Sequence, residues 1–178
     1  MKTGLCFDEV FPTIPAEGWL AEDEARLLWE IASVCEGPIL EVGCYCGRST
    51  ILLAHLGRPV YAVDPFAGFS RDDPTGEGIK TRFLENLAYY AIHNVLLFQQ
   101  RIEDWEPCPL GFAYLDGDHT YAGTVAQIRK ALVCKPQYIA LHDIGEQGEA
   151  VDVTRAAFNN LGAWTLRANR LAVWRIVS

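Results

Sequence analysis

The sequence has no apolar run near the roughly 18–20 residues that a membrane-spanning helix requires, and its first residues carry no apolar signal-peptide core. Three signatures are also absent: the dinucleotide fingerprint G-x-G-x-x-G, the P-loop lysine motif and the G-x-S-x-G hydrolase elbow. The six cysteines show neither zinc-pair spacing nor a C-x-x-C redox motif. We therefore expect a cytoplasmic protein with reduced thiols.

Positive charge is scarce. The chain has 15 lysines and arginines against 23 aspartates and glutamates, which gives a net charge of −8. Nucleic acids and anionic membranes favour basic surfaces, so neither is an expected partner, and a small-molecule substrate fits the composition better. With 178 residues, half of them hydrophobic, the chain is long enough for one domain with a full core.

The most informative stretch is residues 38–50. Pro38 to Val42 reads as a short buried strand, two glycines follow at positions 43 and 47, and Ser49 opens a helical pattern. Glycines allow a sharp turn and a close backbone approach to a ligand, and a helix start offers unpaired N–H groups to an anion. Strand, glycine turn and helix form the first unit of a nucleotide-type βαβ fold.

Strand and helix patterns alternate along the chain. Helical spacing is found at residues 17–34, 50–56, 78–91, 120–133 and 147–161, and strand patterns at 38–42, 60–64, 94–99, 111–115 and 137–141. Residues 163–166 and 171–177 predict a closing hairpin with its turn at 167–170. Residues 1–17 show neither period and are expected to form an arm that packs on the domain. The alternation predicts an α/β fold with a parallel sheet.

Residues 40–49, with the pattern E-x-G-x-x-x-G-x-S, resemble the first motif of class I S-adenosylmethionine-dependent methyltransferases, in particular the catechol-type O-methyltransferases. Residues 81–87 look like the corresponding helix of O-methyltransferases related to cephalosporin and macrolide-sugar tailoring enzymes. The resemblance covers residues 36–178 and implies a Rossmann-like, mostly parallel seven-stranded sheet with a C-terminal antiparallel β-hairpin and helices on both faces. Residues 1–35 then form an N-terminal arm and helix packed on this domain. Similar enzymes are commonly homodimers, so the resemblance also implies a dimer.

The resemblance implies S-adenosyl-L-methionine as cofactor, bound by Glu41, Gly43, Tyr45, Gly47, Ser49, Asp64, Ile102 and Asp116. Ser49 is expected to donate a hydrogen bond to the methionyl carboxylate, and Ile102 to form a wall of the adenine pocket. Asp64 ends the second strand, so it reaches the same sheet edge as the glycine turn, where its carboxylate can accept both ribose hydroxyls.

Two further strand ends carry acid and histidine side chains, Asp116 and His119 after the fourth strand and His142 and Asp143 after the fifth. Their convergence at one edge suits Mg²⁺ or Mn²⁺, which would orient a substrate hydroxyl and lower its pKa. His119 is the expected general base, because the ordinary pKa of a histidine, about 6.5, lets it take up a proton near neutral pH. In related metal-dependent enzymes, residues corresponding to Asp116 and Asp143 bind the metal, and the one corresponding to His119 is the base.

His142 departs from that pattern, because the related enzymes have a carboxylate at its position. The metal site, formed by Asp116, Asp143 and His142, is then softer than usual or stays empty. In the alternative interpretation, His142 and Asp118 only cap helices or hold the loop. The predicted function is methyl transfer to a small-molecule hydroxyl. Its alternatives are an NAD- or nucleotide-sugar-binding oxidoreductase and a cofactor-binding module without turnover.

Overall fold

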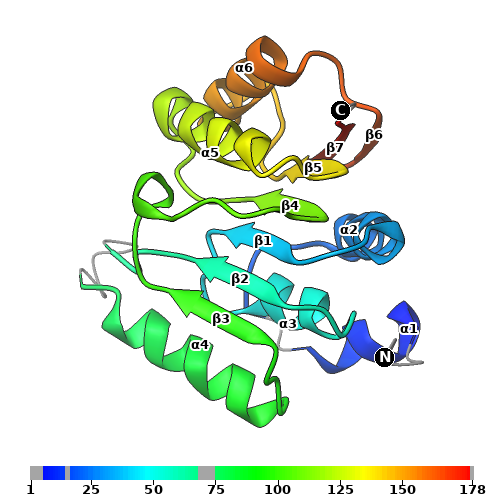
Figure 1. Cartoon of the computed structure of the whole chain (residues 1–178), viewed down its shortest axis with the longest axis vertical. Helices are drawn as coiled ribbons and strands as arrows, with labels where there is room; N and C mark the ends of the chain where they lie inside the picture. Colours follow the sequence, from blue (N-terminus) through cyan, green and yellow to red (C-terminus); the bar gives the residue numbers. More distant parts are fainter. Residues whose placement is uncertain (1–5, 15–16, 68–74, 177–178) are drawn as a thin grey trace.

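The computed structural model describes residues 6–14, 17–67 and 75–176, and it contains one seven-stranded sheet in the order β3-β2-β1-β4-β5-β7-β6 (Figure 1). The strands are β1 (Ile39–Val42), β2 (Val60–Val63), β3 (Val95–Phe98), β4 (Phe112–Leu115), β5 (Tyr138–Leu141), β6 (Leu166–Ala168) and β7 (Leu171–Arg175). The first five strands are parallel, and β7 runs antiparallel to both β5 and β6. This confirms the predicted Rossmann-like sheet with its C-terminal hairpin.

Helices follow the strands in alternation, and both faces of the sheet are covered. They are α1 (Phe7–Val10), α2 (Glu22–Val34), α3 (Arg48–Ala54), α4 (Glu77–Tyr89), α5 (Tyr121–Val133) and α6 (Ala150–Leu161), with short 3-10 turns η1 (Phe11–Thr13) and η2 (Ile102–Asp104). In Figure 1, α5 and α6 lie together beside β5, whereas α4 lies beside the edge strand β3. None of the helices in the described ranges has the length and apolar character needed to cross a bilayer.

Successive residues of the central strands point into two different cores, because side chains alternate across a strand. Ile39 of β1 and Phe112 of β4 pack with α1, α2 and α3, whereas Leu40 and Ala113 pack with α5 and α6. All four are fully buried. This two-sided burial fixes the strand register, and so fixes which residues leave the sheet at its carboxyl edge.

The sequence patterns predicted no helix within residues 7–13. These residues form α1 and η1, and their aromatic side chains lie in the same core as α2 and α3. Helix α2 begins at Glu22 rather than at residue 17. Ala21 is extended there, and its N–H donates to the side chain of Glu24, the half of a capping box that an alanine can form.

The first strand of the hairpin is displaced by a few residues from its predicted position, whereas β7 begins at Leu171 as predicted. Strand β6 spans Leu166–Ala168, so Arg167 lies in a strand, and only Asn169 and Arg170 form the turn. Asn169 has φ = +47°, a conformation that asparagine tolerates better than most residues. Part of the predicted 65–77 loop, residues 68–74, lies outside the described residues.

Candidate active site

A cavity of about 780 Å³ lies where the parallel strands end. It is lined by residues that follow β1, β2, β4 and β5, together with side chains from α5, the 3-10 turn η2 and the segment before α2. Nine predicted site residues line it: Gly43, Tyr45, Ser49, Asp64, Ile102, Asp116, His119, His142 and Asp143. Glu41 and Gly47 do not. The topology brings together residues that lie up to a hundred positions apart, because every parallel strand ends at the same edge.

Gly43 permits a close approach between two strand ends. Its φ is +84°, and a Cβ atom added there would lie 2.1 Å from the carbonyl oxygen of Asp116. Gly47 precedes α3 with φ = +91°, and its missing Cβ leaves room for the ring of Phe83. Packing within the protein therefore requires a glycine at both positions, and the close contact at Gly43 sets the position of Asp116.

Asp64 holds the glycine turn in place. Its Oδ2 accepts hydrogen bonds from the backbone N–H groups of Cys44 at 2.7 Å and Tyr45 at 3.2 Å, and its Oδ1 accepts one from Phe66 at 2.7 Å. Tyr45 has φ = +46°, so this backbone conformation needs support. By the usual count of two lone pairs per oxygen, Oδ1 can still accept from one ligand hydroxyl, whereas Oδ2 already accepts two hydrogen bonds.

Glu41 lies beneath the cavity rather than in its wall. It is fully buried, the Ser49 hydroxyl donates to its Oε1, and its Oε2 has no hydrogen-bond partner among the described residues. Burial raises the pKa of Glu41 to about 8. The protonated carboxyl therefore predominates at neutral pH, and it can donate to Ser49 Oγ and leave the Ser49 hydroxyl hydrogen available to a ligand.

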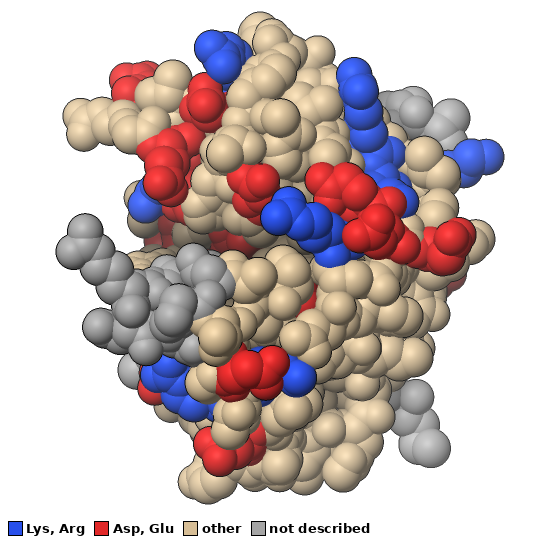
Figure 2. Space-filling model, turned by 90° about the vertical axis from the view of Figure 1, so that its left-hand side faces the viewer, with Lys and Arg blue, Asp and Glu red and all other residues tan. Residues whose placement is uncertain are grey.

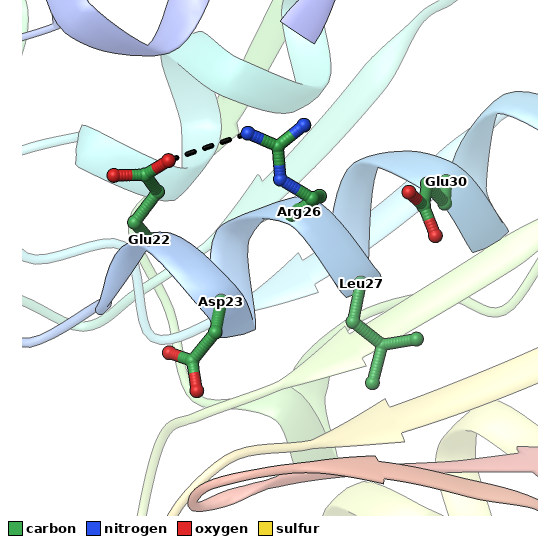
Figure 3. A pocket seen from close by; sticks show the side chains of 5 residues that line it. All are labelled: Glu22, Asp23, Arg26, Leu27 and Glu30. Atoms are coloured by element: carbon green, nitrogen blue, oxygen red, sulfur yellow. Dashed lines mark hydrogen bonds and ion pairs between the residues drawn. The ribbon is translucent and has the colours of Figure 1, made fainter. Parts of the chain in front are cut away.

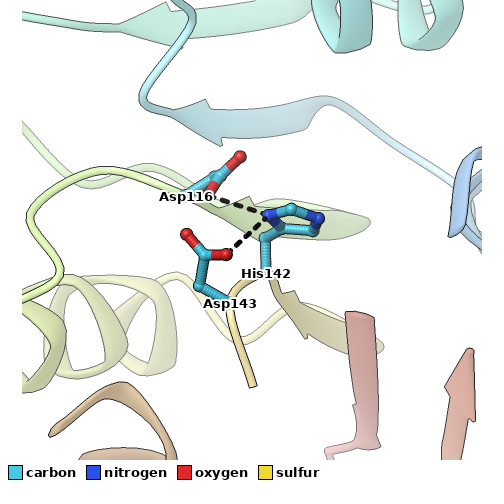
Figure 4. A group of neighbouring side chains, drawn as sticks. All are labelled: Asp116, His142 and Asp143. Carbon is cyan, nitrogen blue, oxygen red and sulfur yellow. Dashed lines mark ion pairs between the residues drawn. The ribbon is translucent and has the colours of Figure 1, made fainter. Parts of the chain in front are cut away.

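Asp116, His142 and Asp143 converge at the ends of β4 and β5 (Figure 4). One ligand atom from each lies within 4.8 Å of the others, a spacing that one cation can bridge. Nδ1 of His142 is 3.4 Å from Oδ1 of Asp116 and 3.5 Å from Oδ1 of Asp143. Arg170 from the hairpin turn places its guanidinium Nη2 2.6 Å from Oδ1 of Asp143.

The charges of this cluster are strongly coupled. Burial alone would lower the pKa of His142, but the carboxylates of Asp116 and Glu24 raise it to about 10. Burial would raise the pKa of Asp116, but contacts with His119 and His142 outweigh it and lower the pKa. Without a metal ion, the imidazolium of His142 thus balances the carboxylates around it.

His119 reaches the same cluster from the loop before α5. Its Nε2 lies 3.4 Å from Oδ1 of Asp116 and 3.3 Å from Oδ2 of Asp143, and its Nδ1 lies 3.6 Å from Glu149. The adjacent Asp116 carboxylate raises the pKa of His119 despite burial. The side chain is 30% exposed, although its Nε2 atom is buried, so an acceptor that enters the cavity can reach only the rest of the ring.

Three residues of the site were missed by the sequence analysis. The buried Tyr114 donates its hydroxyl to Oδ2 of Asp116 at 3.0 Å, which orients that carboxylate. Arg170 lies in the predicted hairpin turn, and pairing of the hairpin with β5 places it beside Asp143. Glu24 is 2% exposed, and its position midway between Leu20 and Leu28 on the apolar side of the helical pattern predicted for residues 17–34 was the available signal.

A second hollow, of about 510 Å³, runs along the outer side of α2 (Figure 3). Glu22, Asp23 and Glu30 border it, and Arg26 is paired with Glu22 at 3.3 Å and with Asp8 at 2.7 Å. None of the strand ends contributes to it. We therefore assign the chemistry to the cavity at the carboxyl edge of the sheet.

Comparison with known proteins agrees with this assignment. Residues 40–144 match the family described as Methyltransferase domain. That stretch is more than half of the chain. It contains the glycine turn and the four clustered residues Asp116, His119, His142 and Asp143. The chain therefore belongs to this methyltransferase family, and it is an enzyme of the class that transfers methyl groups from S-adenosylmethionine.

Solved structures share the fold at low sequence identity. An O-methyltransferase from Bacillus cereus in complex with SAH matches with a TM-score of 0.64 at 17% identity over 93% of this chain and 86% of that one. CalS11, a TDP-rhamnose 3'-O-methyltransferase of calicheamicin biosynthesis, matches with a TM-score of 0.60 at 16% identity, over 85% of this chain and 76% of that one. A ribosomal protein L11 methylase from Lactobacillus delbrueckii subsp. bulgaricus matches with a TM-score of 0.59 at 20% identity, over 85% of this chain and 76% of that one. No curated protein sequence matches the chain.

Proposed function

We propose that this methyltransferase transfers the methyl group of S-adenosylmethionine to a hydroxyl of a small molecule, with help from a divalent cation, Mg²⁺ or Mn²⁺. The observation that carries the proposal is the convergence of Asp116, His142, Asp143 and His119 within one cavity, next to the glycine turn. Two of the three similar structures described above are named as O-methyltransferases, and one of these is named for a nucleotide-linked sugar, TDP-rhamnose.

In this proposal the cofactor lies along the β1, β2 and β3 ends. Gly43 and Tyr45 are at the turn that approaches its methionyl end, Ser49 offers a hydroxyl, Asp64 accepts from the ribose and Ile102 packs against the adenine. These five residues line the cavity, in agreement with the roles proposed for them. Glu41 and Gly47 act indirectly, through Ser49 and through the start of α3.

His119 serves as the general base for the acceptor hydroxyl, since it is the partly exposed imidazole of the cluster. Asp116 and Asp143 orient its Nε2. Two carboxylates and one imidazole also form a suitable donor set for a divalent cation, which when bound would lower the pKa of the acceptor hydroxyl. Methyl transfer then depends on positioning and on exclusion of water.

The acidic charge balance supports a small-molecule acceptor over a nucleic acid. On the face shown in Figure 2, acidic and basic side chains are interspersed, and the described residues visible there form no continuous basic area. Phosphate-backbone recognition would favour such an area.

The test is to supply S-adenosylmethionine with a panel of phenols, sugars and nucleotide-linked sugars and to measure release of S-adenosylhomocysteine. We expect turnover with at least one hydroxyl acceptor, and its loss in Asp116→Asn. Hydride transfer with NAD would favour an oxidoreductase instead. Cofactor binding with no turnover on any acceptor, in the presence of Mg²⁺ or Mn²⁺, would favour a binding module.

A further inference from the structure

A buried carboxylate from helix α2 contacts His142 of the candidate cation site, which is formed by Asp116, His142 and Asp143. Glu24 of α2 is 2% exposed, and glutamates are rarely buried without partners. Both of its oxygens are used. Oε1 accepts from the backbone N–H of Arg170 at 3.0 Å, and Oε2 accepts from the N–H of Ala21 at 2.8 Å and lies 3.1 Å from Nε2 of His142.

This contact determines which nitrogen of the His142 ring points toward the aspartates. The ionised Glu24 carboxylate can only accept, so Nε2 of His142 carries a hydrogen. The other ring nitrogen, Nδ1, points toward Asp116 and Asp143 at 3.4 and 3.5 Å, and a cation that binds it displaces the Nδ1 hydrogen of the imidazolium. Histidines that bind metal ions are commonly held in this way, with the outer nitrogen donating to a carboxylate.

We propose that Glu24 is a positioning residue of the cation site: it presents Nδ1 of His142 as a nitrogen ligand beside the two aspartates, so that the site prefers Mn²⁺ to Mg²⁺. This inference rests on the metal assistance proposed above. Both ions bind carboxylates, but Mg²⁺ demands a nearly ideal oxygen shell and keeps its waters, whereas Mn²⁺, as a first-row transition metal, accepts an imidazole nitrogen more readily. One nitrogen beside two carboxylates therefore favours Mn²⁺ over Mg²⁺.

The substitution Glu24→Gln isolates this role. A glutamine has one acceptor oxygen, but three N–H groups point at the two oxygens of Glu24. If the amide nitrogen faces His142, the ring must accept through Nε2, and its hydrogen moves to Nδ1, where it blocks a metal ion. Glu24→Asp, which keeps the charge, is the conservative variant. Glu30→Gln removes an exposed carboxylate from the same helix and serves as the matched control.

The experiment is a Mn²⁺ titration of the full chain with S-adenosylhomocysteine, followed by electron paramagnetic resonance, with spin-echo detection of ¹⁴N coupled to the ion. We expect an imidazole nitrogen signal in the wild type and in Glu30→Gln. In Glu24→Gln, Mn²⁺ affinity should fall about 10–100-fold with loss of that signal, and Glu24→Asp should recover part of both. Mg²⁺ should compete weakly for the wild-type site.

Three outcomes would overturn the proposal. A wild-type Mn²⁺ signal without nitrogen coupling would show that His142 is no ligand. Unchanged Mn²⁺ affinity and nitrogen coupling in Glu24→Gln would leave Glu24 a structural role only. If the wild type binds S-adenosylhomocysteine but no Mn²⁺ or Mg²⁺, the proposed metal assistance fails together with this inference, whereas the methyltransferase assignment stands.

Discussion

At the scale of single residues, two histidines of the site differ in environment and so in function. His142 is 3% exposed and bridges Glu24 and Asp116, whereas His119 is 30% exposed and faces the cavity. A general base must meet the acceptor and release its proton again, which requires access. The exposed ring is therefore assigned to proton transfer and the buried ring to the cation site.

His119→Ala should lower kcat by about 10²–10⁴-fold, the usual contribution of a general base. Binding of S-adenosylhomocysteine should change little, because the ring is on the acceptor side of the cavity. Steady-state kinetics and calorimetric titration measure the two quantities. The control is His93→Ala, which removes an exposed histidine between α4 and β3. Retention of wild-type kcat in His119→Ala would remove His119 from the mechanism.

Glu41 predicts a pH dependence of stability. Its pKa is about 8 in the folded chain against 4.5 for an exposed glutamate, so the unfolded chain loses this proton first as the pH rises. The free energy of unfolding should therefore fall between about pH 4.5 and 8, and Glu41→Gln should lack this contribution. The difference in stability between Glu41→Gln and wild type should shift in favour of the variant by roughly 1 kcal/mol per pH unit.

Urea unfolding of both proteins at pH 5, 6, 7 and 8 measures that difference. Comparison of the two chains cancels the titration of all other groups to first order. The exposed Glu30→Gln should show no such trend. A difference that does not vary with pH would mean that Glu41 is not held protonated by its burial.

At the scale of elements, the turn between β1 and α3 and the end of β4 form one unit. Gly43 lets these two segments touch, and Asp116 is positioned by that contact. Gly43→Ala should destabilise the protein by about 2–4 kcal/mol, because the added Cβ overlaps the carbonyl of residue 116 and φ is positive. It should also weaken S-adenosylhomocysteine binding.

Gly148→Ala is the control for backbone strain alone. Gly148 also has a positive φ, +58°, but a Cβ there meets nothing within 4 Å. It should cost about 1–2 kcal/mol and leave ligand binding intact. Equal effects of the two substitutions in thermal unfolding would show that the contact with Asp116 is unimportant.

The sequence was informative about elements because the signals for strands and glycine turns are local. Seven strands, their alternation with helices, and the residues that end β2, β4 and β5 followed from apolar runs punctuated by glycine, proline and acids. Element ends were less accurate. Side chains set them: the capping contact of Glu24 delays the start of α2 to Glu22.

The missed residues depend on long-range contacts. Glu24 meets His142 across 118 positions and the N–H of Arg170 across 146, and neither pairing has a local signature. The helical pattern around Glu24 predicted a buried face but not what a carboxylate on that face would contact. The hydrogen bonds of Asp64 to Cys44 and Tyr45 were likewise unforeseen.

At the scale of the whole molecule, the site depends on five segments that come together only in the complete fold. They are helix α2, the glycine turn, the end of β4, the end of β5 and the C-terminal hairpin. Glu24 contacts both His142 and the hairpin backbone, and Arg170 contacts Asp143. A ligand that binds this cavity is therefore expected to stabilise the chain as one unit.

Thermal unfolding with S-adenosylhomocysteine tests the central claim most directly. A ligand at about 100 times its dissociation constant adds roughly 2.7 kcal/mol to folded-state stability, which should raise the midpoint by about 5–10 °C for a domain of this size. We predict that rise with S-adenosylhomocysteine and none with NAD. A rise with NAD alone, or no rise with S-adenosylhomocysteine, would contradict the assignment of the cavity to a methyl-donor cofactor.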